Sequence, residues 1–81
     1  MMLFDDYCAI PLSQVVKIVF FSKTISIHYF NGEYVDLEFC DGRFPRVEIK
    51  DLKFDSEDEV VRLKRQFYKA CSEGKKAFYF G

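Results

Sequence analysis

The sequence predicts an α+β fold in which a four-stranded antiparallel meander is covered on one face by a single C-terminal α-helix, with a short final strand after it. Residues 15–50 are rich in β-branched and aromatic side chains and are broken by turn-forming pairs, a pattern typical of hairpins. Residues 56–73 instead repeat apolar side chains at helical spacing. With 81 residues, the chain has room for one domain, 1–81, around a single core.

Four strands are predicted, at about 15–21, 24–29, 33–39 and 43–50. A shift of one residue would move every side chain of a strand to the other face, so the apolar pattern selects the turns. A two-residue turn at Ser22-Lys23 and three-residue loops ending at Gly32 and Gly42 bring the apolar side chains together. Pro45 lacks a ladder donor, so the fourth strand is expected at an edge. The predicted inner face comprises Val16, Ile18, Phe20, Ile25, Ile27, Tyr29, Val35, Leu37, Phe39, Val47 and Ile49.

The helix is predicted over about residues 56–73. Ser56 is suited to be its N-cap, Glu59 completes a capping box, and the acidic residues between them favour the positive end of the helix dipole. Gly74 is expected to end the helix. The side chains predicted to pack on the sheet are Val60, Leu63, Phe67, Ala70 and Cys71.

Both ends of the chain carry short apolar segments outside the meander. Residues 76–80 predict a short last strand beside the first strand, and residues 7–10 predict another. The N-terminal segment, residues 1–12, is expected to pack on the sheet, and in one interpretation it covers the outer face as a lid.

The composition narrows the class of protein. Twelve basic and thirteen acidic residues give a formal net charge of −1, so the molecule as a whole is not suited to polyanions, although local patches remain. Cys8, Cys40 and Cys71 are odd in number and have no C-x-x-C spacing, which predicts free thiols in a reducing cytoplasm rather than a disulfide framework or a zinc site. No apolar run approaches the ~20 residues of a membrane span, and the acidic N-terminus lacks the basic region of a signal peptide. We therefore expect a cytoplasmic protein.

The sequence offers no set of catalytic residues. His28 is the one histidine of the chain, and a metal site would need several carboxylates converging on it. Ser26, His28 and Asp36 follow the alternation of polar residues that any exposed antiparallel sheet shows. No phosphate-binding loop, paired nucleophile and base, or cofactor motif is present. The sequence therefore predicts no metal, no cofactor and no enzymatic activity.

The face of the meander opposite the helix is more apolar than water contact requires. Aromatic side chains on a rigid sheet are good interface anchors, and an apolar patch of this kind marks a partner surface. We expect a protein partner or a second copy of the chain there, unless the N-terminal segment covers the face. The predicted partner-binding residues are Val15, Val19, Phe21, Phe30, Tyr34 and Phe44.

A second candidate surface is basic. Between residues 62 and 76 Glu73 is the one acid, and an aromatic strand, Phe78-Tyr79-Phe80, follows. Such a surface could hold a nucleic-acid backbone and stack bases, although a solvated helix face that complements the helix dipole has the same composition. The candidate nucleic-acid contacts are Arg62, Lys64, Arg65, Lys69, Lys75 and Lys76.

Residues 10–73 resemble small bacterial and phage domains that run strand, turn, β-meander and acid-capped helix, and most of these are uncharacterised. The likeness rests on Ile10-Pro11-Leu12-Ser13-Gln14, Thr24-Ile25-Ser26-Ile27-His28-Tyr29 and Asp55-Ser56-Glu57-Asp58-Glu59. It implies an accessory protein of a phage or mobile element. Residues 70–75, Ala-Cys-Ser-Glu-Gly-Lys, with Phe78 after them, resemble the end of the KTSC domain, for which RNA binding has been suggested; the Tyr-x-Tyr of that family is replaced by Phe44-Pro45-Arg46. We expect a small non-enzymatic protein-interaction module, with nucleic-acid binding as the alternative.

Overall fold

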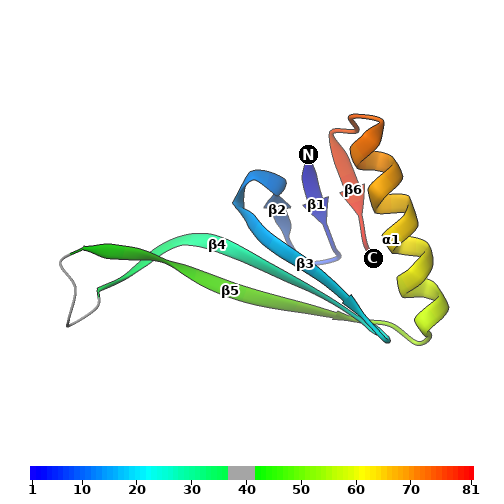
Figure 1. Ribbon diagram of the computed structural model, residues 1–81, viewed down its shortest axis with the longest axis horizontal. Coiled ribbons are helices and arrows are strands. Elements are labelled where there is room, and N and C mark those ends of the chain that lie inside the picture. The colour runs from blue at the N-terminus through cyan, green and yellow to red at the C-terminus, as the bar shows by residue number, and fades with distance from the viewer. Residues whose placement is uncertain (37–41) are drawn as a thin grey trace.

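The computed structural model describes residues 1–36 and 42–81 and has an α+β fold with one helix in the C-terminal half, as predicted (Figure 1). A short 3-10 turn, Leu12–Gln14, joins the second and third strands. The elements in these ranges are β1 (Met2–Phe4), β2 (Ala9–Pro11), β3 (Val15–Phe21), β4 (Thr24–Asp36), β5 (Arg43–Lys53), α1 (Glu57–Ser72) and β6 (Ala77–Tyr79).

The strands form two sheets, so the prediction of a single four-stranded meander was wrong. The large sheet has the antiparallel order β3-β4-β5, which places β5 and Pro45 at an edge as expected. The small sheet has the order β2-β1-β6, in which β1 pairs antiparallel with β2 and parallel with β6. Residues 76–80 do supply a last strand, but its neighbour is β1 at the N-terminus rather than residues 15–21.

The predicted turn at residues 30–32 is a β-bulge within β4. The strand continues through Gly32. Ile25 and Ile27 therefore pair with Leu52 and Lys50 of β5, whereas the predicted turn would pair Ile27 with Val35 and Ile25 with Leu37. Gly32 has a φ of +90° and supplies the left-handed residue that was expected there. Because such a glycine fits a bulge as well as a turn, the local sequence did not distinguish the two. Asn31 supports the bulge, since its side chain accepts a hydrogen bond from the N–H of Glu33 at 2.9 Å.

The long β4–β5 hairpin also changes which side chains of β5 face the core. Its even-numbered residues lie on the side of Ile25 and Ile27, so Leu52 packs against the core while Val47 and Ile49 are exposed on the other face. Val16 and Val35 are exposed as well, which corrects the predicted inner face at four positions. Two further predicted members, Leu37 and Phe39, lie outside the described residues.

The core lies between the inner face of the large sheet, the small sheet and α1 (Figure 1). The N-terminal segment therefore packs against the inner side of the large sheet, and the interpretation of residues 1–12 as a lid on the outer face was wrong. The buried cluster comprises Leu3, Ile10, Ile25, Ile27, Val60, Leu63, Phe67 and Phe80.

The predicted N-cap at Ser56 and the predicted end of the helix at Gly74 are confirmed. The side chain of Ser56 accepts a hydrogen bond from the N–H of Glu59 at 3.4 Å. At the other end, the N–H of Lys75 donates to the carbonyl of Ala70 at 3.0 Å, and the N–H of Gly74 donates to Cys71 at 3.2 Å. These two bonds form a Schellman motif, which requires the left-handed φ of +69° at Gly74.

Replacing Gly74 by alanine is expected to lower the free energy of unfolding by about 1 kcal/mol, because a Cβ disfavours the left-handed conformation. A Cβ at this position meets no other atom within 4 Å, so the cost comes from the backbone alone. Gly74→Asn is the matched control and should lose less, since asparagine tolerates this conformation. Urea denaturation followed by circular dichroism measures both; equal stabilities for alanine, asparagine and glycine would contradict the assignment.

Candidate protein-interaction surface

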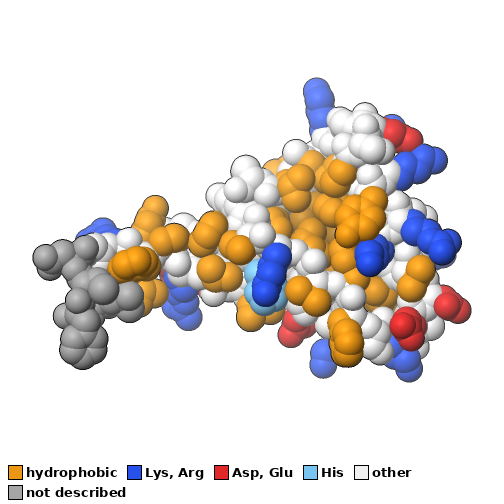
Figure 2. Space-filling model, viewed as in Figure 1, with side chains coloured by type: hydrophobic (Ala, Val, Ile, Leu, Met, Phe, Trp, Pro, Cys, Tyr) orange, Lys and Arg blue, Asp and Glu red, His pale blue; other side chains and the backbone are white. Residues whose placement is uncertain are grey.

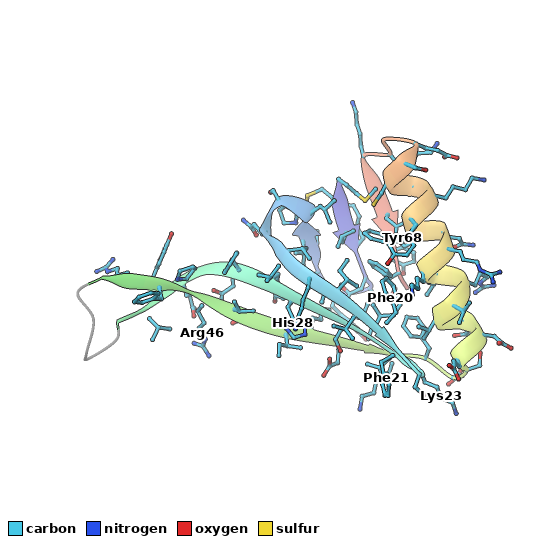
Figure 3. The ribbon with its side chains drawn as sticks, in the orientation of Figure 1. Phe20, Phe21, Lys23, His28, Arg46 and Tyr68 are labelled. Carbon is cyan, nitrogen blue, oxygen red and sulfur yellow. The ribbon has the colours of Figure 1, made fainter. Side chains whose placement is uncertain are left out.

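The outer face of the large sheet is the side turned away from the helix and the core. The ladder places Lys17, Val19 and Phe21 of β3 beside His28, Ser26 and Thr24 of β4, and these beside Ile49, Asp51 and Lys53 of β5. In Figure 3, Phe20 points from β3 toward α1 and Tyr68, whereas its neighbour Phe21 points away from them. The alternation therefore separates a packed aromatic ring from an exposed one.

Beyond the end of β3, the hairpin continues as a two-stranded arm, which we define as residues 30–36 of β4 and 43–47 of β5. The last residue of β4 that pairs with β3 is Tyr29. The arm extends away from the body of the molecule on the side opposite α1 (Figure 1). Consequently the molecule measures 45 × 27 × 21 Å and its radius of gyration is 14.6 Å, whereas a compact chain of this length has about 12 Å.

Large apolar side chains are exposed along the outer face and the arm. Figure 2 shows hydrophobic side chains around His28 and along the arm. The exposed fractions are 75% for Phe21, 61% for Tyr34, 60% for Ile49, 43% for Val47 and 39% for Val19. Two-stranded ribbons are marginally stable in water unless an apolar face is covered. This surface therefore combines exposed apolar side chains from all three strands of the large sheet.

The structure brings together some of the predicted partner-binding residues and separates others. Val19, Phe21 and Tyr34 are exposed, and Phe30 is half-buried. Val15 packs against the core, because the ladder shifts between Val15 and Lys17 and pairs Val15 with Tyr29. Phe44 is exposed but pairs with Val35, and its even position in β5 turns it to the opposite side of the arm from Val47.

Sequence reasoning missed Val47 and Ile49, which are exposed on the outer face. A signal for them exists in the chain. The apolar residues of β5 change from odd positions, 47 and 49, to an even position at Leu52. One regular strand cannot point all three to the core, so either the pair or the single residue had to face outward.

The polar residues of the outer face are paired with one another or stand beside apolar neighbours. The hydroxyl of Ser26 donates to Asp51 across the β4–β5 ladder at 2.5 Å. His28 lies between Lys17 and Ile49 and is half-buried. Within residues 1–36 and 42–81, no three His, Cys, Asp or Glu side chains group in a way that could hold a metal ion. In the arm, a guanidinium nitrogen of Arg46 lies 3.2 Å from a carboxylate oxygen of Glu33. The backbone register of the arm places Asp36 opposite Arg43.

The candidate nucleic-acid contacts are all exposed but do not form one site with the aromatic strand. Their spacing puts Arg62, Arg65 and Lys69 on the side of α1 opposite the core. The ammonium of Lys64 lies over the rings of Phe20 and Tyr68, 5.7 and 6.0 Å from their centroids. One carboxylate oxygen of Glu73 lies 3.9 Å from the ammonium nitrogen of Lys69, and the other lies 3.8 Å from that of Lys75. Lys76 is exposed in the loop before β6.

Of the aromatic strand itself, Phe80 is buried and Phe78 packs edge-on against Phe67 with ring centroids 5.5 Å apart. Tyr79 is exposed, and its hydroxyl donates to Asp6. Two of the three rings that were expected to be free for stacking are therefore occupied by the core.

A cavity of about 350 Å³ lies between β5 and the loop after β1. Its central feature is an ion pair, 2.9 Å long, between the ammonium of Lys50 and the carboxylate of Asp5, which is largely buried. The other oxygen of Asp5 accepts hydrogen bonds from the N–H groups of Tyr7 and Cys8 at 2.9 and 2.7 Å. Because each oxygen of Asp5 already has a partner, this cluster fixes the loop to β5 and is poorly suited to bind a ligand.

No protein-family model, curated protein or solved structure matches this chain. The described part of the chain also contains no helix with the length and apolar character needed to cross a membrane.

Proposed function

We propose that this protein is a small non-enzymatic protein-interaction module, which binds a partner chain through the outer face of the large sheet and the arm. The observation that carries the proposal is the set of exposed apolar side chains that all three strands of the large sheet contribute, above all Phe21, Ile49 and Tyr34. Aromatic and branched side chains on a rigid sheet bind without losing much conformational freedom, so they are effective anchors.

The accessible surface supports the proposal. It measures 6039 Å², whereas a compact monomer of 9.6 kDa exposes about 5,100 Å². The excess of roughly 900 Å² is close to the ~800 Å² that each partner buries in a stable interface of standard size. Cys8 and Cys71 are free thiols, which fits the proposed cytoplasmic setting.

Nucleic-acid binding is the second candidate, and the observation in its favour is the cluster of Lys64 over Phe20 and Tyr68 beside the basic ridge of α1. It ranks second because Phe78 and Phe80 are packed in the core. This candidate requires an affinity for DNA or RNA that falls as salt rises, and a gel shift at low salt measures it.

The double variant Phe21→Ser and Tyr34→Ser is expected to abolish partner binding while leaving the fold intact, because both side chains are more than half exposed. The tagged protein is incubated with extract of its native host, and the retained proteins are quantified by mass spectrometry. Differently tagged copies of the chain itself are included, so that self-association is scored in the same experiment.

The matched control is Val61→Ser with Tyr68→Ser, which removes two exposed apolar side chains from α1 instead. Circular dichroism confirms that both variants are folded. A partner retained by the wild type and the control but lost from the sheet variant supports the proposal. Identical retention by all three proteins, including their own tagged copies, would remove it.

A further inference from the structure

The open edge of β5 carries a self-complementary pattern. Within residues 1–36 and 42–81, β5 has one strand neighbour, β4. The N–H of Phe54 donates to the carbonyl of Lys23 at 2.8 Å, which continues the β4–β5 ladder. Because hydrogen bonding alternates along an antiparallel ladder, the even-numbered residues of β5 bond to β4, and the odd-numbered residues turn their N–H and C=O groups to the open edge. Pro45 is at one of these odd positions, so its missing N–H leaves the β4–β5 ladder intact and removes one donor from the open edge.

We propose that the partner of this edge is a second copy of the chain. The two β5 strands pair antiparallel about a twofold axis at Val47 and join the two large sheets into one six-stranded sheet. This inference rests on the proposed function and names the partner. An open edge strand is a ready template for another strand, and twofold symmetry is the commonest arrangement of protein dimers.

Charge selects this register. With the axis at Val47, Arg46 lies opposite Glu48 of the second copy and Arg43 lies opposite Asp51, and each pair occurs twice. Moving the axis one residue toward the C-terminus would set the two copies of Glu48 against each other. Moving it one residue the other way would do the same to the two copies of Arg46. The neighbouring registers therefore place like charges at their centres, whereas the Val47 register places opposite charges beside it.

The existing partners of Arg46 and Glu48 are compatible with the pairing. Arg46 donates one bond to Glu33, and an arginine carries five N–H donors. Glu48 accepts bonds from the hydroxyl of Tyr29 and the amide of Asn31, and a carboxylate offers about four acceptor sites. Both residues can therefore keep their bonds within the chain and add one across the interface.

The same register joins the apolar surfaces of the two copies. Val47 faces Val47 of the second copy, and Ile49 faces Pro45, so these side chains form one apolar strip at the centre of the six-stranded sheet. Val47 and Ile49 are exposed on the outer face, where the core does not use them.

Disulfide trapping tests the register. In a hydrogen-bonded antiparallel pair the Cα atoms lie about 5.5 Å apart, within the range that a disulfide spans. In a background whose native cysteines are replaced, Val47→Cys is expected to form a covalent dimer under mild oxidation. Ile49→Cys is the matched control; its copies lie four residues out of register and should remain monomeric on a denaturing gel. Cross-linking that is equal in the two variants, or absent from both, would overturn the register.

Charge reversal provides an independent test by sedimentation equilibrium over a dilution series. Arg46→Glu alone and Glu48→Arg alone are each expected to weaken self-association about tenfold, because two attractive pairs become repulsive. An equimolar mixture of the two variants should associate again, since each introduced charge then faces a charge of opposite sign. Failure of the mixture to recover, with both variants folded, would refute the pairing.

The outcomes separate this inference from the proposed function. A monomeric wild type without a Val47→Cys cross-link, but with a foreign protein captured through Phe21 and Tyr34, refutes the homodimer and leaves the interaction module standing. A captured foreign strand that competes with Val47→Cys cross-linking would identify β5 as the edge for another protein and likewise overturn the second copy. A dimer that Val47→Cys traps supports the edge pairing. It supports the proposed function as well only where the Phe21→Ser and Tyr34→Ser variant loses a partner, because Phe21 lies on β3, at the other edge of the sheet.

Discussion

Replacing Phe67 by alanine is expected to lower the free energy of unfolding by about 3 to 5 kcal/mol. Phe67 is buried at the centre of the core, and its ring contacts those of Phe20, Phe78 and Phe80, with centroids 6.4, 5.5 and 5.7 Å away. These neighbours come from the large sheet and from the C-terminal segment, so the alanine variant leaves a cavity where the layers meet. A domain of this length has a total stability of roughly 4 to 12 kcal/mol, so this substitution removes a large share of it.

Tyr68→Ala is the matched control, because Tyr68 is the next residue of the same helix and is more than half exposed. Tyr68→Ala should lower the free energy of unfolding by only a fraction of the loss expected for Phe67→Ala. Urea denaturation followed by far-ultraviolet circular dichroism suits this chain, which contains no tryptophan. Equal losses for the two variants would show that the core does not lie where the structure places it.

Acidification from about pH 5 to pH 2 is expected to remove about 2 kcal/mol of stability through Asp5 alone. Burial raises the pKa of this carboxyl, but the ion pair with Lys50 and the N–H groups of Tyr7 and Cys8 outweigh burial and lower the pKa from 3.8 to about 2. Because the folded pKa lies below the unfolded pKa, the stabilisation is fully present above pH 3.8 and is lost as the pH falls toward 2. The same pair raises the pKa of Lys50.

The control for this prediction is Asp5→Asn, whose amide oxygen can still accept the backbone bonds but carries no charge. The variant should be less stable than the wild type at pH 7 and should show a smaller loss of stability between pH 5 and pH 2. Urea midpoints measured at each pH provide the comparison. Parallel pH profiles for the two proteins would mean that Asp5 is not the carboxylate responsible.

The sequence alone predicted those parts of the fold that short-range signals determine. The acids and Ser56 before a periodic apolar stripe located α1, and Gly74 located its end. The predicted two-residue turn at Ser22-Lys23 is confirmed, and it pairs Ile18 with Ile27 and Phe20 with Ile25. In each case the residues that decide the structure lie close together in the chain.

The remaining features depend on distant partners, which the local pattern does not reveal. The sequence at Gly32 is compatible with either a turn or a bulge. The structure has the bulge, because β5 is long enough to pair with β4 on both sides of Gly32. Lys50 can face the core because Asp5, far away in the sequence, neutralises it. The candidate surface shows the same limit. The sequence predicted that Val19, Phe21 and Tyr34 are exposed on it, but the exposure of Val47 and Ile49 depends on the register of β5 against β4.

The parallel pairing of β1 with β6 has a consequence for how the chain folds. Leu3 stands beside Phe78, so the small sheet joins segments that lie at opposite ends of the sequence. Contacts of such long sequence separation form late, because the loop between them must first be closed. During synthesis, the side chains of Leu3 and Ile10 therefore remain without their final neighbours until residues 77–80 have left the ribosome. The hairpin and α1 can assemble before that moment, but the core closes only afterwards.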